Sequence, residues 1–206
     1  MKLFAKPRPP LFSPELTFPE EVRSVVEETY ARAQSILEYG SGGSTLLAAR
    51  LGRKVRAVES DAAWAEQMTA CLAREAPGAD ARVLHCDIGR TGKWGRPLNA
   101  RNMEAFYRYP LEVWDGEDFS PPDVVLVDGR FRVACFCTVL MRIENPVTVL
   151  FDDYETRQGY HRVEKLQRPV RRIGRMAVFE VTPGKIPPQD LTWVTGSFFK
   201  TTYAKR

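Results

Sequence analysis

The 206-residue sequence has little of what marks several large protein classes. No apolar run approaches the ~18 residues that a membrane-spanning helix needs, the longest lying around residues 133–141. The four cysteines show neither a CxxC pair nor zinc-ligand spacing, so we expect buried thiols and no disulfide scaffold. There is no internal repeat and no low-complexity tract. With 44% hydrophobic and 27% charged residues, the composition is that of a globular protein, not of a disordered or collagen-like one.

The charge is close to balanced. Thirty Lys and Arg residues against 26 Asp and Glu residues give a net charge of +4, a mild excess that suits small anionic ligands. The basic runs at 168–175 and 200–206 carry no interleaved aromatic motif, so we expect a solvated basic face and neither nucleic acid nor a membrane as a partner. Prolines break the N-terminus before an apolar leader segment could form, which favours a cytoplasmic location. No pattern indicates an oligomeric state.

What the chain does have is an alternation of strand and helix patterns. The DVVLV segment at 123–127 is apolar in the way of a strand that is covered on both faces. The other predicted elements are helices at 19–33, 44–51, from Asp61 to the stop at Pro77-Gly78, 130–143 and 160–166, strands at 35–39, 55–59, 81–84 and 147–151, and a closing hairpin at 170–173 and 176–181. This order predicts an α/β fold with a doubly wound, mainly parallel sheet of about seven strands and a C-terminal antiparallel hairpin.

The length and the alternation of strands and helices predict one domain over residues 1–206. Three segments fall outside the alternation. Residues 1–18 are proline-rich and are expected to form an N-terminal arm, residues 89–119 an insertion or lid, and residues 182–206 a basic C-terminal tail.

The strongest local signal is the glycine loop ILEYGSGGST at residues 36–45. A predicted strand ends at Tyr39, Gly40, Ser41 and Gly42 turn the chain, and a helix begins at Ser44 or Thr45. Glycines allow a tight turn and a close approach of the backbone to a ligand, and the helix start offers unpaired N–H groups. Nineteen residues after Gly40, the next strand ends at Glu59, whose carboxylate can accept two ribose hydroxyls. Strand, loop, helix, strand and acid together predict a nucleotide-containing cofactor.

At these residues the sequence resembles the class I S-adenosylmethionine-dependent methyltransferases. Their first motif is an acidic residue followed by x-Gly-x-Gly-x-Gly. Glu38, Gly40 and Gly42 match it, and Ser44 stands in place of the last glycine. The resemblance covers roughly residues 19–181 and implies that S-adenosylmethionine is the cofactor, with its amino-acid part against the glycine loop and Ser41.

The same resemblance assigns the nucleoside part by position. It implies that Glu59 holds the ribose, that Asp87 faces the adenine amine, and that Ile88 lies beside the adenine ring.

Three aspartates are expected at the carboxyl ends of two strands, Asp128 after the fourth and Asp152 and Asp153 after the fifth. They predict either a divalent cation site, with Mg²⁺ as the ion, or helix caps and substrate contacts without metal. The metal alternative resembles the catechol O-methyltransferases of the same superfamily, which bind magnesium with an Asp after the fourth strand and an Asp-Asn pair after the fifth. Here Asp153 stands where the asparagine would be.

Arg130 and Arg132 follow Asp128 in the DGRFR segment, which holds no lysine to accept a proton. Guanidinium groups stay protonated but clamp carboxylates and phosphates, so these arginines predict an anionic acceptor, with surface ion pairs as the alternative. Trp94, in the glycine-containing loop at 87–97, is expected to lie over the acceptor or to fill a hydrophobic gap.

These features predict methyl transfer from S-adenosylmethionine to a small anionic or hydroxylated acceptor. The catalytic candidates are Asp128, Arg130, Asp152 and Asp153. Two other functions stay open. A nicotinamide-dependent oxidoreductase is opposed by Thr45 in place of a third glycine and by the lack of a second domain. A methyltransferase-like protein that binds a cofactor or a partner without turnover is allowed because no clear general base is present.

Overall fold

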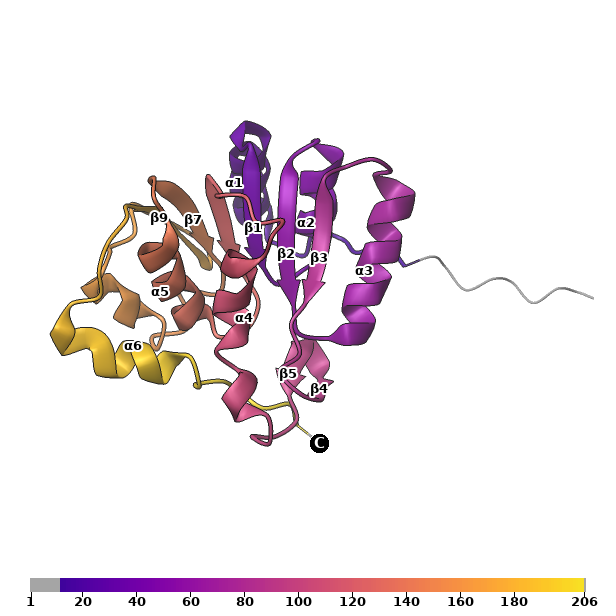
Figure 1. Ribbon diagram of the computed structural model, residues 1–206. Coiled ribbons are helices and arrows are strands. Elements are labelled where there is room, and N and C mark those ends of the chain that lie inside the picture. Colours follow the sequence, from indigo (N-terminus) through magenta and orange to yellow (C-terminus); the bar gives the residue numbers. More distant parts are fainter. Residues whose placement is uncertain (1–11, 206) are drawn as a thin grey trace, which may run out of the picture.

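A seven-stranded sheet organises the computed structural model, which describes residues 12–205 (Figure 1). Its strands are β1 (Ser35–Tyr39), β2 (Lys54–Glu59), β3 (Ala81–His85), β6 (Val124–Val127), β7 (Val147–Phe151), β8 (Arg171–Ile173) and β9 (Met176–Val181). They lie in the order β3-β2-β1-β6-β7-β9-β8. The strands from β3 to β7 in this order are parallel, and β9 pairs antiparallel with β7 and β8. The doubly wound sheet with a C-terminal antiparallel hairpin is confirmed.

Helices cover both faces of this sheet. The helices are α1 (Glu20–Arg32), α2 (Gly43–Arg50), α3 (Ala62–Glu75), α4 (Arg108–Leu111), α5 (Arg132–Arg142) and α6 (Leu191–Ser197), with short 3₁₀ turns at Lys93–Gly95, Met103–Ala105, Glu112–Asp115, His161–Lys165 and Pro188–Asp190. In Figure 1, α1, α2 and α3 lie behind and to the right of the sheet, and α4, α5 and α6 lie in front and to the left. None of the helices within residues 12–205 is long and apolar enough to span a membrane.

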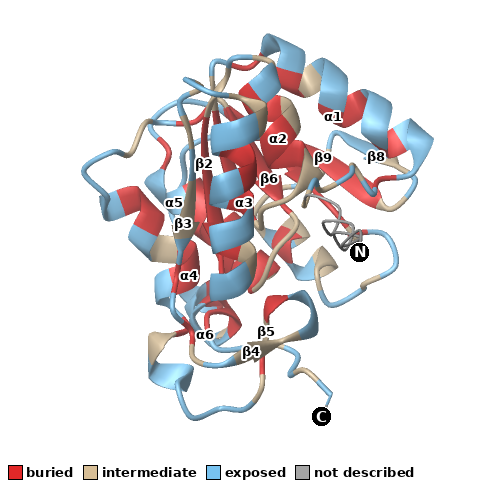
Figure 2. Cartoon of the chain, turned by 90° about the vertical axis from the view of Figure 1, so that its right-hand side faces the viewer, coloured by how far each residue is buried: buried red, intermediate tan, exposed pale blue. Residues whose placement is uncertain are grey.

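Successive strand residues enter different cores because side chains alternate across a sheet. Val124 and Leu126 pack with α1 in one hydrophobic cluster, whereas Val125 and Val127 pack with α5 in the other. The strands are therefore buried on both sides, as the red interior of Figure 2 shows. This burial explains why the central strands read as continuous apolar runs.

The strand register aligns the ends of β2, β1, β6 and β7 at one edge of the sheet. Tyr39 of β1 pairs with Val58 of β2 and with Val127 of β6, and Val127 pairs in turn with Phe151 of β7. Because these strands are parallel and in register, the residues that follow them meet at the same carboxyl edge.

The segment at 89–119 contains more regular structure than the sequence indicates. A small antiparallel hairpin is formed by β4 (Thr91–Gly92) and β5 (Arg96–Pro97), and α4 follows before β6. The hairpin is anchored by Thr91 Oγ1, which donates a hydrogen bond to Asp61 Oδ2 at 2.9 Å, and by Ser60 Oγ, which donates to the Gly95 carbonyl at 2.9 Å. These contacts fix its position beside the end of β2.

The expected C-terminal tail also folds, because it has apolar residues to bury. In α6, Val194 is buried, and Phe198 is buried just after the helix; both belong to the core cluster of α5. Further on, the Ala204 N–H donates to the Pro97 carbonyl at 2.9 Å. Residues 182–205 therefore cover α5 and support the β4–β5 hairpin.

Helix α5 begins two residues later than the pattern predicts. Phe131 adopts a left-handed backbone conformation, with φ of 49°, which the helix cannot include. Arg130 therefore lies outside the helix and Arg132 is its first residue.

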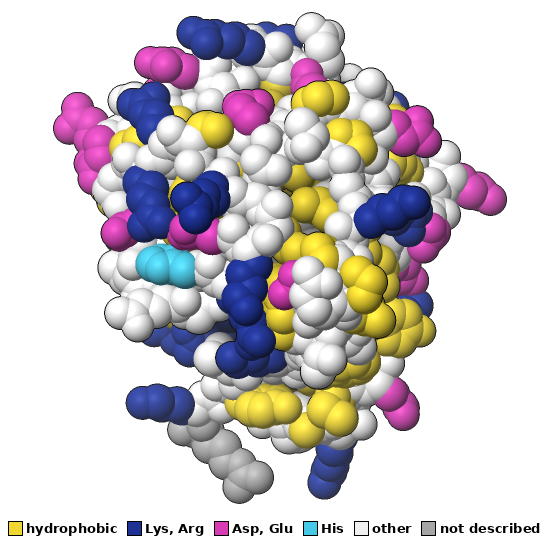
Figure 3. Space-filling view, turned by 90° about the vertical axis from the view of Figure 1, so that its left-hand side faces the viewer, with side chains coloured by type: hydrophobic (Ala, Val, Ile, Leu, Met, Phe, Trp, Pro, Cys, Tyr) yellow, Lys and Arg dark blue, Asp and Glu magenta, His cyan; other side chains and the backbone are white. Residues whose placement is uncertain are grey.

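The surface beside α5, α6 and β9 is shown in Figure 3. Its Lys and Arg side chains stand in separate groups, several of them next to Asp or Glu. Within the basic run at 168–175, Arg172 pairs with Glu155 at 3.0 Å and with Glu164 at 2.6 Å. Arg175 points inward and pairs with Asp152 at 2.8 Å, which corrects the expectation that the whole run is a solvated face.

The packing of α5 on the sheet depends on Phe136, which is fully buried between Phe151 and Phe179. We expect Phe136→Ala to lower the free energy of unfolding by about 3–5 kcal/mol, because a cavity remains where the ring was. Phe199→Ala, at a 39% exposed ring, should cost about 0.5 kcal/mol or less. Denaturant unfolding of both variants measures the difference, and equal losses would contradict this packing.

Candidate functional site

A cavity of about 800 Å³ lies at the carboxyl edge of the sheet. Its wall includes residues 14–18, the glycine loop at 40–44, residues 59–61 after β2, residues 92–96 of the hairpin and residues 128–130 after β6. Arg132, Asp152, Asp153, Arg157 and Arg175 complete the charged part of the wall. Most sequence-predicted site residues meet here: Gly40, Ser41, Gly42, Ser44, Glu59, Trp94, Asp128, Arg130, Arg132, Asp152 and Asp153. Glu38, Asp87 and Ile88 do not line the cavity.

The glycine loop is shaped by close backbone contacts. Gly40 has φ of +102°, and a Cβ there would lie 3.0 Å from the Gly129 nitrogen. Only glycine combines this conformation with this approach at low cost. The glycine loop thus packs against residues 128–130, which follow β6, and these two parts of the cavity wall meet at Gly40.

Glu38 holds the glycine loop from inside the core. Its buried carboxylate accepts hydrogen bonds from Tyr30 Oη at 2.6 Å and from Thr45 Oγ1, and Thr45 Oγ1 accepts one from the Gly42 N–H at 3.0 Å. Burial raises the pKa of Glu38 from 4.5 to about 7, because it penalises the charged form more than these donors stabilise it. Glu38 therefore positions the loop and does not face the cavity.

Glu59 ties the loop to the end of β2. Its Oε1 accepts the N–H of Ser60 at 2.7 Å and that of Asp61 at 3.0 Å. Its Oε2 accepts Ser41 Oγ at 3.0 Å and the Ser41 N–H at 3.3 Å. The carboxylate is thus oriented toward the loop at the cavity wall, and the partners of Oε2 both come from one residue.

Asp87 and Ile88 lie away from this wall. Asp87 is exposed and accepts the Gly89 N–H at 2.8 Å, and Ile88 is fully buried in the core. The hairpin residues 92–96 line the cavity beside Glu59 and Ser60. The structure therefore does not bring the two residues that the resemblance assigns to adenine into the cavity.

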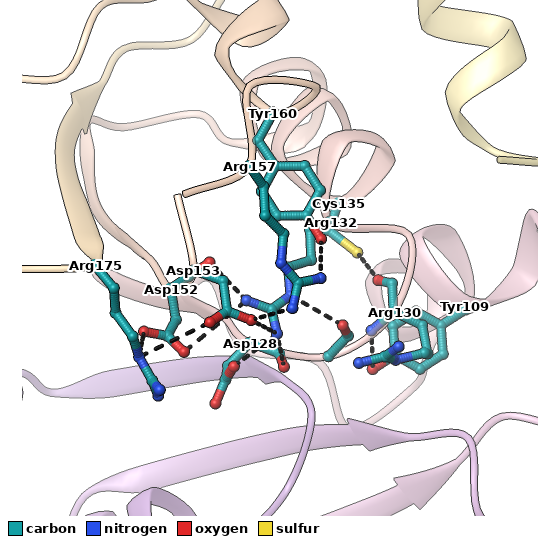
Figure 4. A network of polar contacts seen from close by, with 11 residues as sticks. Tyr109, Asp128, Arg130, Arg132, Cys135, Asp152, Asp153, Arg157, Tyr160 and Arg175 are labelled. Carbon is teal, nitrogen blue, oxygen red and sulfur yellow. Dashed lines mark hydrogen bonds and ion pairs between the residues drawn. The ribbon is translucent and has the colours of Figure 1, made fainter. Parts of the chain in front are cut away.

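A buried guanidinium occupies the centre of the aspartate group (Figure 4). Arg132 is 5% exposed and lies 2.9 Å from Asp128, 3.2 Å from Asp153 and 4.0 Å from Asp152. It also donates to the Asp152 carbonyl at 2.6 Å and to the Asp128 carbonyl at 2.8 Å. Arg132 is therefore a structural cation here and not the free substrate contact that the sequence suggests.

Two more arginines pair with the aspartates and balance their negative charge. Arg175, from the turn between β8 and β9, lies 2.8 Å from Asp152, and Arg157 lies 2.8 Å from Asp153. Sequence reasoning missed both residues, because they lie in segments without a motif.

The aspartates do not fit a magnesium ion in this arrangement. One carboxylate oxygen from each of Asp128, Asp152 and Asp153 lies within 4.8 Å of the others, a spacing that a metal could use. The guanidinium of Arg132 fills the same group and already supplies the positive charge. A divalent cation would have to displace a buried arginine, so no step is assigned to Mg²⁺.

Backbone strain gathers at the cavity. Within residues 12–205, the non-glycine residues with positive φ are Trp94 (67°), Phe131 (49°) and Asp153 (55°). Trp94 and Asp153 line the cavity, and Phe131 lies between the two lining residues Arg130 and Arg132. Trp94 is 69% exposed, with Lys93 Nζ 5.5 Å from the centre of its ring. Such conformations are costly and concentrate where a site needs a particular geometry.

The N-terminal arm closes one side of the cavity, which the sequence did not indicate. A Cβ at Gly43 would overlap the backbone of Glu15, so the arm lies directly on the glycine loop. Phe12 packs edge-on against Trp64 with ring centres 4.9 Å apart, and Arg23 donates to the Leu16 carbonyl at 2.9 Å. Residues 1–11 of the expected arm lie outside the described residues.

Comparison with known proteins identifies the family. No protein-family model and no curated protein matches this sequence. Among solved structures, a methyltransferase-like protein from Silicibacter pomeroyi is 45% identical, with 91% of this chain and 98% of that chain covered and a TM-score of 0.87. The chain belongs to the class I methyltransferase superfamily.

A more distant solved structure resembles the chain in fold alone. A protein assigned as a caffeoyl-CoA O-methyltransferase from Staphylococcus aureus is 13% identical, with 76% of this chain and 68% of that chain covered and a TM-score of 0.50. An O-methyltransferase from Bacillus cereus, in complex with SAH, is 19% identical over 77% of this chain and 78% of that chain, with a TM-score of 0.48.

The raised pKa of Glu38 predicts a pH-dependent stability. Between pH 4.5 and 7 the native state holds a proton that the unfolded chain releases, so this group makes the protein less stable as the pH rises. Glu38→Gln removes this titration. The free energy of unfolding of the variant minus that of the parent should therefore increase by about 3 kcal/mol between pH 4.5 and pH 7. Urea unfolding across this range measures the difference, with the exposed Glu28→Gln as the control. Parallel curves for parent and Glu38→Gln would contradict the buried, protonated state.

A second prediction concerns the Arg132 guanidinium. Arg132→Met leaves like charges unpaired and should lower the free energy of unfolding by about 3–5 kcal/mol. Mg²⁺ should then raise the melting temperature of this variant, because the emptied aspartate group can accept a cation. The parent and the exposed-arginine control Arg101→Met should not respond. Saturable binding of Mg²⁺ to the parent in a calorimetric titration would show that the arginine does not replace the metal.

Proposed function

We propose that this methyltransferase-like protein transfers a methyl group from S-adenosylmethionine to a small acceptor. The observation that carries the proposal is one continuous cavity of about 800 Å³ at the carboxyl edge. The glycine loop and Glu59 line it after β1 and β2, and Asp128 and Arg130 line it after β6. Because β1 lies between β2 and β6, a cofactor at the first group and an acceptor at the second would be neighbours.

Glu59 and the loop suit the ribose and amino-acid parts of this cofactor. Both donors to Oε2 of Glu59 belong to Ser41, and the longer of them is 3.3 Å. A ribose hydroxyl can therefore replace the Ser41 hydroxyl while Oε1 keeps its two backbone donors. Gly40 brings the loop backbone to the cavity wall without a side chain in the way.

S-adenosylmethionine supplies an electrophilic methyl group on a sulfonium. The protein needs to align the acceptor with that methyl group, and alignment of this kind lowers a barrier by several kcal/mol. The acceptor oxygen would form a bond to the methyl carbon while the electron pair of the broken carbon–sulfur bond stays on sulfur. The proton of the acceptor hydroxyl would pass to Asp128, which lines the cavity.

The environment of Asp128 suits this role. Burial raises the pKa of its carboxyl; Arg132 opposes the rise, and Asp152 and Asp153 add to it. A carboxylate with a raised pKa is a better proton acceptor near neutral pH than an exposed one. Asp152 and Asp153 are engaged with Arg175 and Arg157 and would orient Arg132, without contacting the reacting atoms.

The test is calorimetric titration with S-adenosylhomocysteine, which fills the cofactor site without reacting. We expect the parent to bind it and to bind neither NAD nor NADP. Glu59→Gln should weaken binding about tenfold to a hundredfold, because a charged acceptor for the ribose hydroxyls is lost. Glu28→Gln, at an exposed glutamate of α1, is the matched control and should bind like the parent.

Two results would contradict the proposal. Equal affinity of parent and Glu59→Gln would remove the ribose assignment. Binding of NAD in place of S-adenosylhomocysteine would favour an oxidoreductase. If S-adenosylhomocysteine binds but labelled S-adenosylmethionine never loses its methyl group to a panel of carboxylates and phenols, the protein is a cofactor-binding relative without turnover.

A further inference from the structure

Arg96 and Arg130 differ from the other arginines of the cavity wall. Arg132, Arg157 and Arg175 are each paired with aspartates. Within residues 12–205, no carboxylate lies within 4.0 Å of a side-chain nitrogen of Arg96 or Arg130. Figure 4 shows the guanidinium of Arg130 beside Tyr109, apart from the aspartate group. Two arginines of the cavity wall thus have no counter-ion from the described residues.

Both side chains are partly withdrawn from water. The Nε of Arg96 is buried and has no hydrogen-bond partner among the described residues, although such donors in folded proteins are nearly always satisfied. Arg130 is half-buried. Its backbone N–H donates to Tyr109 Oη at 3.4 Å, and its carbonyl accepts from Cys135 Sγ at 3.3 Å. The guanidinium is therefore the polar group of Arg130 that is left for a ligand. Within residues 12–205, the Arg96 Nε therefore lacks an acceptor, and the Arg130 side chain is part of the cavity wall.

The electrostatics are also incomplete. Burial lowers the pKa of Arg130, and the like charges of Arg132 and Arg96 lower it further. Arg132 differs, because Asp128, Tyr160 and the other two aspartates together outweigh the effect of its burial and hold its pKa above the usual value. The start of α5, immediately after Arg130 and Phe131, adds the positive end of a helix dipole. An anion beside Arg130 would offset the repulsion from Arg132, from Arg96 and from the positive end of the helix dipole.

The backbones that carry the two arginines are fixed before any ligand binds. Gly95 and Pro97, which flank Arg96, are held by Ser60 Oγ and by the Ala204 N–H, each at 2.9 Å. The left-handed Phe131 turns Arg130 away from Arg132, so one arginine serves the aspartates and the other remains for the cavity. Each guanidinium is planar and can bind a carboxylate or a phosphate through two parallel N–H donors.

We propose that Arg96 and Arg130 bind a carboxylate or phosphate of the methyl acceptor, so that the acceptor is a small anion. This inference rests on the proposed function, since it assigns the acceptor end of the same cavity. Arg130 lies two residues after Asp128, so an anionic group held there would leave the acceptor's reacting atom beside the proposed proton acceptor. The carboxylate of the cofactor has the same chemistry, and the experiment separates the two sources.

Three full-length proteins are compared: the parent, Arg96→Gln/Arg130→Gln, and Arg90→Gln/Arg101→Gln. The last removes two exposed arginines outside the cavity wall and matches the change in net charge. Each is titrated with S-adenosylhomocysteine and with 5′-methylthioadenosine, which lacks the amino-acid carboxylate. Inorganic phosphate and benzoate are then titrated into the S-adenosylhomocysteine complexes, and thermal unfolding checks that each variant is folded.

We expect both nucleosides to bind all three proteins within about twofold. The anions should bind the parent and the control, and bind the cavity variant about tenfold more weakly or not at all, because charge-assisted bidentate hydrogen bonds are lost. Arg130→Lys, which keeps the charge without the planar group, should fall between the parent and the cavity variant.

Equal anion binding by parent and cavity variant, or none by the parent, would overturn the proposal. So would a loss of affinity for S-adenosylhomocysteine but not for 5′-methylthioadenosine, because the arginines would then hold the cofactor's carboxylate. If the parent does not bind S-adenosylhomocysteine, the proposed function fails. The anions are then titrated into the unliganded proteins, where an effect of the two arginines supports an anion site and no effect overturns it.

Discussion

The carboxyl edge of this sheet depends on one buried ion-pair group, centred on Arg132. Its guanidinium joins the end of β6, the start of α5 and the end of β7 through Asp128, Asp152 and Asp153. Three carboxylates so close together would repel one another without it. Arg157 and Arg175 add the remaining charge, so loops from distant parts of the chain are tied to the same place. The cavity wall owes its shape to this group.

This internal cation also changes what the site can do. The space among the three carboxylates, which a cation could otherwise use, holds the Arg132 guanidinium. A side-chain guanidinium thus supplies the positive charge among these aspartates, and the catalytic roles that we propose for the residues of the site are positioning and proton acceptance. Among the described residues, Arg96 and Arg130 of the same cavity wall have no carboxylate partner. The cavity wall thus combines arginines that are paired with aspartates and the two arginines that we propose bind an anion.

Much of the fold could be predicted because it follows from local patterns. Alternating apolar segments indicated the strands, Asp61 indicated the start of α3 through its cap on the Trp64 N–H, and Gly40 indicated the tight turn after β1. The positions of Asp128 and Asp152 followed from the rule that parallel strands end at one edge. The adenine positions assigned by resemblance do not line the cavity, whereas residues 92–96 of the β4–β5 hairpin, which is bonded to Ser60 and Asp61, do. Segments 14–18, Arg157 and Arg175 were missed, since no motif marks them and their contacts join residues far apart in the chain.

The sequence by itself determined the order of the elements, the glycine loop and the placement of Asp128, Asp152 and Asp153 at the carboxyl edge. These depend on hydrophobic periodicity and on strand direction, both of which are local properties. Only the tertiary structure decided which charge pairs with which. The left-handed turn at Phe131 sends Arg130 and Arg132 to different places, and the β8–β9 turn brings Arg175 to Asp152. Ion pairing depends on distances of a few ångströms between side chains, and such distances exist only once the separate segments are packed together.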